Sequence, residues 1–270
     1  MRRARDRAST DATSPVIPLK SSSDIDAIGR AGRIIASLFE ELPARIAAGM
    51  TTDDLDGFCD EFVRSHAGAV PSFKGLYGFP RSACISVNEE VVHGIPSPGR
   101  VLAAGDLVTV DVGVELDGWF GDAARTYPVE AVSGDVMRLI DTTRAALIAG
   151  VEQAVAGNRL GDVGNAIQTV AEAAGLSVVR ELVGHGIGRR PHEEPNVPNY
   201  GDPGKGLRLR SGMVLAIEPM LNLGGPDVET LEDDWTVVTA DRLPSAHFEQ
   251  TVAITAEGPR VLTGLNGNRL

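Results

Sequence analysis

The stretch from 107 to 127, LVTVDVGVELDGWFGDAARTY, constrains the fold more than any other, because it predicts a long β-hairpin. Valines alternate with polar residues or glycine over positions 108–115, which is the period-two pattern of a strand with one apolar face. Asp117-Gly118 is the kind of residue pair that two-residue type I′ turns prefer. A tight turn at this pair sets the pairing of the two strands.

That pairing places two acidic residues on one face of the hairpin. With Leu116 opposite Trp119, Asp111 and Asp122 become diagonal neighbours whose backbones lie about 7–8 Å apart. Carboxylates this close repel each other unless a cation lies between them, and two divalent ions about 3.5–4 Å apart would satisfy both. From the hairpin alone, two solvated acids on an exposed face are the favoured interpretation. The rest of the chain reverses it.

Composition limits the class of protein. The chain has 270 residues, of which 43% are hydrophobic, which suits one large domain or two small ones and is long enough to bury a sizeable core. A net charge of −12 argues against nucleic acid as the main partner. Two cysteines, Cys59 and Cys84, predict no disulfide framework and fit a reducing compartment. No apolar run reaches the roughly 18–20 residues of a membrane span and no secretory signal is present, so we expect a cytoplasmic protein.

Periodicity predicts two helix pairs, each accompanied by strands. Residues 1–15 are rich in Arg, Ser and Thr and are expected to be a disordered extension, followed by a short strand at 16–20. The predicted helices cover about 22–48, 52–66, 134–156 and 160–174, and the other predicted strands about 83–87, 91–93, 177–182, 213–217 and 247–254. An offset of 108 residues aligns the helix pairs, which indicates an internal duplication with halves at about 16–132 and 133–270. Chance similarity of amphipathic helices is the competing explanation.

The second half contributes polar residues in unusual settings. His185 lies between glycines in GHGIG, where Arg189 occupies the last glycine position of a dinucleotide fingerprint and so excludes that motif. Glu218 ends an apolar strand, and Glu249 is predicted inside another. A carboxylate in such a strand is costly unless it is paired or bound to a metal.

Five residues are therefore candidate metal ligands: Asp111, Asp122, His185, Glu218 and Glu249. Four carboxylates and one imidazole suit two divalent ions such as Mn, Fe, Co or Zn, rather than a cysteine-type structural zinc site. Two such ions support hydrolysis, because they generate hydroxide at neutral pH and polarise a carbonyl. His93, and His192 in a predicted loop at 192–195, are left as neutral hydrogen-bonding groups. His66 and His247 are interpreted as surface histidines.

The sequence resembles the type I methionine aminopeptidases from about position 16 to 262. The matching stretches are NEEVVHGIP (88–96), DVGVELDGWFGDAARTY (111–127), GHGIGRRPHEEPNVPNY (184–200), AIEPML (216–221) and HFEQTV (247–252). Type II members carry a long insertion between the positions that match His192 and Glu218, where this chain has only 25 residues. The resemblance implies an α+β, pita-bread (creatinase/aminopeptidase-like) fold, with two pseudo-symmetric αβ halves around a central antiparallel sheet.

The same resemblance implies a role for each site residue. The four acids and His185 would bind two divalent metal ions, His93 and His192 would contact the substrate during catalysis, and Glu218 would also shuttle a proton. A methionine pocket is implied at Phe73, Leu76, Phe79, Cys84 and Trp235. The implied activity removes the initiator methionine from nascent chains whose second residue is small. We expect a monomer without membrane or specific nucleic-acid partners, and the PxxP-bearing extensions of some relatives imply that residues 1–15, with the PxxP spacing of Pro15–Pro18, could associate with the ribosome.

Two other interpretations stay open. X-Pro aminopeptidases and dipeptidases share the five-ligand pattern but normally carry an additional N-terminal domain, whereas about 20 residues precede the first predicted helix here. Some pita-bread proteins have lost catalysis and bind peptides or partners, but those usually lack the ligands. Bound metal, and cleavage of Met-Ala-Ser rather than Ala-Pro peptides, would separate these classes.

Overall fold

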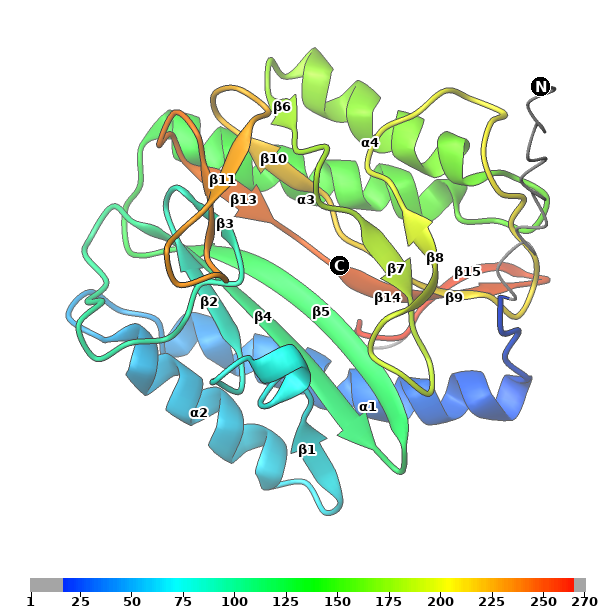
Figure 1. Cartoon of the computed structure of the whole chain (residues 1–270), viewed down its shortest axis with the longest axis horizontal. Helices are drawn as coiled ribbons and strands as arrows, with labels where there is room; N and C mark the ends of the chain where they lie inside the picture. Colours follow the sequence, from blue (N-terminus) through cyan, green and yellow to red (C-terminus); the bar gives the residue numbers. More distant parts are fainter. Residues whose placement is uncertain (1–16, 265–270) are drawn as a thin grey trace, which may run out of the picture.

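Helices line two opposite sides of a group of antiparallel strands in the computed structural model, which describes residues 17–264 (Figure 1). The pair α1 (Ser22–Glu41) and α2 (Thr52–Arg64) lies on one side, and the pair α3 (Gly134–Gln153) and α4 (Leu160–Ala173) lies on the other. The strand expected at 16–20 is absent over residues 17–20, which have no regular structure. Lys20 makes one backbone hydrogen bond there, to the carbonyl of Gly212. The disorder expected for residues 1–15 falls outside the described residues.

The first two helices begin at capping boxes. The Ser21 hydroxyl accepts a hydrogen bond from the Asp24 N–H, and the Asp24 carboxylate accepts one from the Ser21 N–H. Thr51 and Asp54 make the same reciprocal pair at the start of α2. Each box satisfies two backbone donors that a helix start leaves free. The expected start of the first helix near Ser22 is therefore confirmed.

The first helix is shorter than predicted. It ends at Glu41 rather than near position 48, and a 3-10 turn, η1 (Leu42–Ala44), follows. Pro43 explains the difference, because proline has no N–H and its ring clashes with the carbonyl four residues earlier. The other three helices end within three residues of their predicted ends.

Within residues 17–264 the strands form four antiparallel sheets. In the first, β1 (Ala69–Pro71) and β2 (Cys84–Val87) pair with one edge of β4 (Leu107–Leu116), and β5 (Trp119–Pro128) pairs with the other edge. The largest has the order β15 (Gly258–Val261), β14 (Gln250–Thr255), β9 (Val214–Ile217), β7 (Gly184–Gly186) and β8 (Glu193–Val197). The two small sheets are β13 (Ser245–His247), β10 (Met220–Asn222) and β6 (Ser177–Val178), and β11 (Val228–Thr230), β12 (Val237–Thr239) and β3 (Glu90–Val92).

The β4–β5 hairpin has the predicted register. Leu116 lies opposite Trp119, Asp111 opposite Ala124, and Asp122 opposite Gly113. Both aspartates thus share one face. On the opposite face, alternate valines of β4 are buried against α1 and α2. Because helices cover the apolar face, the acidic face is the one left for a site.

Three strand predictions differ from the structure. The strand expected at 177–182 is limited to β6. The run at 247–254 is broken, because the chain leaves its partner β10 after His247 and joins β9 only at Gln250. Glu249 lies in that break, and its N–H donates to the carbonyl of Ala124 in β5. The loop expected at 192–195 is also wrong from Glu193 onward, where β8 begins.

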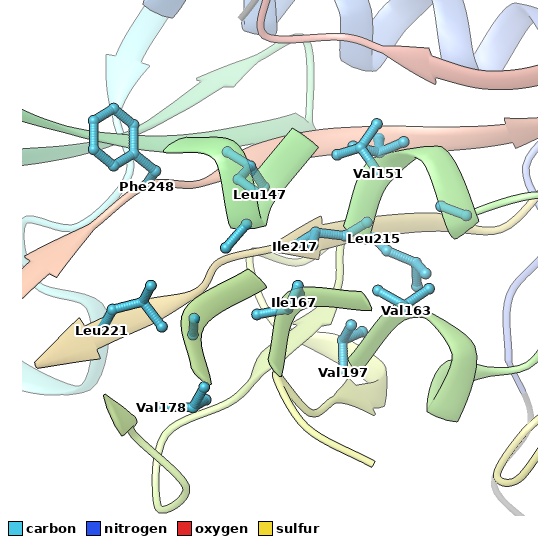
Figure 2. Packing of buried hydrophobic residues seen from close by; sticks show 14 of the residues in the cluster. Leu147, Val151, Val163, Ile167, Val178, Val197, Leu215, Ile217, Leu221 and Phe248 are labelled. Carbon is cyan, nitrogen blue, oxygen red and sulfur yellow. The ribbon is translucent and has the colours of Figure 1, made fainter. Parts of the chain in front are cut away.

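Two apolar cores hold the helices onto the strands. In Figure 2, Leu147 of α3 and Ile167 of α4 lie beside Ile217 of β9, within a cluster that extends to Phe248. The second cluster joins α1 and α2 to β2, β4 and β5. Both cysteines are buried and unpaired, as the composition predicted. No helix within residues 17–264 is both long and apolar enough to cross a membrane.

Glycines let α1 lie directly on the outer face of β5. A Cβ atom on Gly121 would lie 3.1 Å from the backbone nitrogen of Gly32. A Cβ on Gly32 would lie 2.3 Å from the carbonyl oxygen of Leu262. A larger side chain at Gly121 would therefore push α1 away from the strand, one residue from Asp122, whereas one at Gly32 would push against the main chain at Leu262.

Two threonine hydroxyls join β5 to strands of the second half. Thr251 Oγ1 accepts a hydrogen bond from the Asp122 N–H at 3.0 Å and donates to the Asp122 carbonyl at 2.8 Å. Thr126 Oγ1 makes the same pair of bonds with the backbone of His247, at 3.0 and 2.9 Å. The backbones of Asp122 and His247 are thus each fixed by a threonine from the neighbouring sheet.

Candidate active site

One cavity of about 590 Å³ gathers every site residue predicted from the sequence. Four carboxylates contribute to its wall: Asp111, Asp122, Glu218 and Glu249. Four imidazoles do so as well: His93, His185, His192 and His247. An apolar part is formed by Phe73, Leu76, Phe79, Cys84 and Trp235.

The acids reach the cavity from separate parts of the chain. Asp111 and Asp122 project from β4 and β5, Glu218 follows the end of β9, and Glu249 lies between β13 and β14. His185 is the middle residue of β7 and lies opposite Ala216 in the ladder with β9. The site therefore exists only when the first and second halves of the chain are packed together.

Three of these residues already lie at metal-ligand spacing. Asp122, His185 and Glu249 each offer one ligand atom, and these atoms all lie within 4.8 Å of one another. The Nε2 atom of His185 is 3.5 Å from Glu218 Oε1. His185 Nδ1 lies 2.9 Å from the carbonyl oxygen of Gly186, and since a carbonyl only accepts, Nδ1 carries the proton. Nε2 then directs its lone pair towards the acids, as a metal-binding imidazole does.

The carboxylates are buried without the partners that such groups normally have. One oxygen of each of Asp111, Asp122 and Glu249 is buried and lacks a hydrogen-bond partner among residues 17–264. Burial, together with the neighbouring carboxylates, raises the pKa values of Asp111, Glu218 and Glu249 well above their ordinary range. Burial also raises the pKa of Asp122 to about 7. Cations between the acids would supply the missing partners, so this donor set fits divalent metal ions.

Burial keeps the histidines of the cavity neutral at ordinary pH. It lowers the pKa of His185 to about 4, and it lowers the pKa values of His93 and His192 as well. The His192 ring packs edge-on against His185 at 4.4 Å between centroids, and Tyr77 stacks on it at 5.7 Å. The Tyr77 hydroxyl lies 3.4 Å from His192 Nδ1. Both Tyr77 and His93 have left-handed backbone angles (φ 51° and 59°), a strained geometry that concentrates at functional sites.

The apolar residues form a separate compartment beside the acids. Phe79 and Trp235 meet edge to face at 5.1 Å, next to the buried side chains of Phe73 and Cys84. Cys84 pairs with Asp111 in the ladder between β2 and β4, so the compartment adjoins the acidic cluster directly. Burial, and then the nearby acids, hold the pKa of the Cys84 thiol well above its usual range, so the thiol stays neutral.

One histidine prediction is wrong. His247, interpreted as a surface residue, is only 1% exposed and contributes to the cavity wall. Its Nε2 lies 3.8 Å from Glu218 Oε2, and burial lowers its pKa to about 3. The signal was present in the sequence, because His247 precedes Glu249 by two residues, the spacing of side chains on one strand face. His66, by contrast, lies at the end of α2 away from the cavity, with Nδ1 3.0 Å from the carbonyl oxygen of Phe62.

A buried ion pair supports the loop that carries His192, and sequence analysis missed it. Lys20 Nζ lies 2.6 Å from Glu193 Oε2, with both side chains at most 5% exposed. The other oxygen, Oε1, accepts hydrogen bonds from the backbone N–H groups of Arg189 and Arg190. Gly188 makes room for the pair, since a Cβ there would lie 2.5 Å from Lys20 Cε. The segment before α1 is thus tied to the residue next to His192.

Residues 26–256 match the family model described as metallopeptidase family M24. The methionine aminopeptidase of Clostridium perfringens (strain 13 / Type A) is 51% identical over 92% of this chain and 99% of its own length. The crystal structure of the methionine aminopeptidase from Thermotoga maritima superposes with a TM-score of 0.90 at 42% identity, covering 92% of this chain and all of that one. An Xaa-Pro dipeptidase from Bacillus anthracis shares the fold at a TM-score of 0.73 and 22% identity, over 93% of this chain and 63% of that one.

These likenesses confirm the pita-bread fold that the resemblance implied, with αβ halves around antiparallel strands. They also agree with the composition of the cavity, in which buried acids without partners and one oriented imidazole suit divalent metal. The chain belongs to metallopeptidase family M24.

Proposed function

We propose that this protein is a metal-dependent aminopeptidase that removes the N-terminal methionine from peptide chains. The observation that carries the proposal is the cluster of buried acids without partners, placed directly beside an apolar compartment. The first feature calls for cations and the second for an apolar side chain. Relatives that are 51% and 42% identical over most of the chain bear the name methionine aminopeptidase.

The metal centre that we propose consists of Asp111, Asp122, His185, Glu218 and Glu249. These residues would hold two divalent ions from the group Co, Mn, Fe and Zn, because four carboxylates offset four positive charges. When bound, such ions lower the pKa of water and polarise a carbonyl oxygen. The support is the orientation of His185 Nε2 towards the acids and the raised pKa values of the carboxyl groups.

The remaining polar side chains would handle protons and orient the peptide. Glu218 would take a proton from the attacking water and pass it to the leaving amine, since its carboxylate lies on the cavity wall among the other acids. His192 would donate a hydrogen bond to the scissile carbonyl oxygen. Tyr77 supports that role, because its hydroxyl can donate to Nδ1 and leave the proton on Nε2. His93, which lies edge-on to Trp235, would hydrogen-bond the peptide backbone.

The apolar compartment would select the side chain. Phe73, Phe79, Cys84 and Trp235, with Leu76 at the edge, would surround one unbranched thioether, and methionine is flexible and polarisable enough to fill such a space. The nearby acids would attract the free amino group of the substrate. We extend the proposal to small second residues, as the resemblance to methionine aminopeptidases implies.

The cellular setting belongs to the same proposal. Action on nascent chains in the cytoplasm, by a monomer with no nucleic-acid partner, is consistent with two buried free thiols and a net charge of −12. Association with the ribosome rests on residues 1–16, which lie outside the described part, and stays a prediction. The boundary between the halves at 132/133 likewise stays a prediction.

One peptide-mixture assay tests the proposal. The purified protein is stripped with a chelator, reconstituted with Co, Mn, Fe or Zn, and incubated with peptides that begin Met-Gly, Met-Ala, Met-Ser, Met-Leu, Met-Lys and Ala-Pro, plus N-acetyl-Met-Ala. Mass spectrometry should show methionine released from the first three only, and no release by the stripped protein. Equal release from Met-Ala and Met-Lys, or cleavage before proline whatever the first residue, would instead favour the X-Pro peptidases.

A further inference from the structure

His247 is a buried polar side chain that the proposed function does not use. It is 1% exposed, and neither Nδ1 nor Nε2 has a hydrogen-bond partner among residues 17–264. Buried polar side chains almost always have at least one partner, so an imidazole with both nitrogens free needs a specific explanation. Its position on the cavity wall indicates that the explanation lies inside the cavity.

The backbone of His247 is fixed independently of its ring. Thr126 Oγ1 accepts from its N–H at 3.0 Å and donates to its carbonyl at 2.9 Å, while Met220 lies opposite it in β10. Backbone contacts therefore fix where the ring lies, and its Nε2 faces the carboxylate of Glu218 in the cavity. A side chain held in this way is suited to positioning another group.

The group in front of His247 is the carboxylate of Glu218. His247 Nε2 lies 3.8 Å from Oε2, and His185 Nε2 lies 3.5 Å from Oε1, so the carboxylate is flanked by two imidazoles. The two contacts differ in kind. His185 already donates Nδ1–H to a carbonyl, so its Nε2 and Glu218 Oε1 are both acceptors that need a cation between them. Within residues 17–264 no carbonyl accepts a hydrogen bond from His247, so its proton is free to lie on Nε2 and to be donated to Oε2.

We propose that His247 is a positioning residue for Glu218: it donates Nε2–H to Oε2 and holds the carboxylate with Oε1 turned towards His185. The proposal rests on the proposed function, in which Glu218 is a metal ligand and proton carrier. The gap of 3.8 Å must shorten by about 1 Å to reach hydrogen-bond length, a change typical of catalytic contacts that tighten only when the site is filled.

Two other roles for His247 make different predictions. A sixth metal ligand would direct Nε2 to a metal ion rather than to Glu218 Oε2, so the number of bound ions would depend on the imidazole. A purely apolar wall for the methionine compartment would be served as well by leucine. Variants of His247 distinguish these roles, because each role predicts a different result.

The variants at position 247 compare side chains that keep an N–H donor with side chains that lack it or hold it too far away. His247→Gln keeps an N–H donor at similar reach, His247→Leu keeps the bulk without a donor, and His247→Asn keeps the amide on a shorter side chain. His66→Gln, outside the cavity, is the matched control. Calorimetric titration of Mn into the stripped proteins measures metal affinity and stoichiometry, steady-state kinetics on Met-Ala-Ser measure kcat and KM, and thermal unfolding of the stripped proteins reports on the fold.

We expect His247→Leu and His247→Asn to weaken metal binding and lower kcat by about 10–100-fold, the usual effect of removing a group that orients a ligand. The number of bound ions and KM should change little, His247→Gln should recover most of both losses, and His66→Gln should behave as the wild type. If His247→Leu fails to fold, the contrast between Gln and Asn still decides. A wild type that binds no metal and releases no methionine would instead be a failure of the proposed function.

Three results would overturn the proposal. A lost metal ion in His247→Gln would make His247 a ligand. A rise in KM alone would make it a wall of the methionine compartment. Gln no better than Leu, or Leu as active as the wild type, would show that its N–H does not matter to Glu218.

Discussion

Two sets of buried carboxylates, Glu193 and the acidic cluster of the cavity, differ in whether the protein supplies hydrogen-bond partners to their oxygens. Both oxygens of Glu193 are satisfied, one by Lys20 and the other by two backbone N–H groups. In the acidic cluster, Asp111, Asp122 and Glu249 each leave one buried oxygen without a partner among residues 17–264. The protein is therefore able to supply partners to a buried acid. Where it supplies none, the acids are left to bind a ligand. They destabilise the folded protein only while that ligand is absent.

The comparison is tested most severely by Asp111→Asn. Removing one of four crowded acids should lower kcat/KM with Met-Ala-Ser by on the order of 10³-fold or more, beyond the loss of a single hydrogen-bond donor to the transition state. The stripped protein should be at least as stable as the wild type, because like-charge repulsion is relieved. Kinetics on the reconstituted enzyme and thermal unfolding of the stripped one measure the two effects. Near-normal turnover at any metal concentration would remove Asp111 from the metal centre.

Loss of the partner of Glu193 should instead destabilise the folded protein. Lys20→Met leaves Glu193 charged and buried, so the free energy of unfolding should fall by about 3–5 kcal/mol in urea titrations. Lys20→Met combined with Glu193→Gln should recover part of that loss, since no charge is then stranded. A single variant as stable as the wild type would show that the pair is not the structural element described here.

His192 lies between the two sets, next to Glu193 in sequence and against the His185 ring in space. His192→Ala should lower turnover by about 10²–10³-fold, the usual effect of losing a donor to a developing oxyanion. Metal content, measured by atomic absorption on the same preparation, should stay at the wild-type level. If metal content falls in step with activity, His192 belongs to the metal centre and its role is misassigned.

The smallest expected effect is the stabilisation of the folded protein by bound metal, which should depend on the acidic cluster and not on the Lys20–Glu193 pair. Mn at 100 times its dissociation constant should raise the free energy of unfolding by about 2.7 kcal/mol, as any ligand specific for the folded state does. Lys20→Met should show the same increment from its lower baseline, because the ion pair lies outside the ligand set. Asp111→Asn should show little or none at that concentration. An equal increment in all three proteins would mean that the stabilising ions bind elsewhere.

Local chemistry explains which features the sequence predicted. The hairpin register depends on the Asp117-Gly118 turn and on period-two alternation, and both act between neighbours in the chain. Asp111 and Asp122 stood out because that register puts them on one face, and Glu218 and Glu249 because a carboxylate in an apolar strand is costly unless it is paired or metal-bound. The end of α1 was predicted wrongly, although its cause, Pro43, is also local.

The features that were missed depend on contacts between distant segments. Glu249 lies between strands because the chain exchanges β10 for β9 as its neighbour, which no local pattern records. Lys20 and Glu193 are 173 residues apart, and neither has a flanking sequence that marks it as buried. His247 is the intermediate case, since its spacing from Glu249 was visible but its burial depends on Thr126 across the junction.

The contact between Gly32 and Gly121 has a consequence for genetic screens. It lies on the outer face of β5, where α1 rests against the strand, whereas the neighbouring Asp122 faces the cavity. A substitution that enlarges Gly121 presses β5 away from α1 and shifts Asp122 on the other face of the strand. In a screen for lost activity, such alleles should group with ligand mutants rather than with ordinary folding mutants. The strand that such a substitution displaces would explain its phenotype, and its distance from the cavity would not.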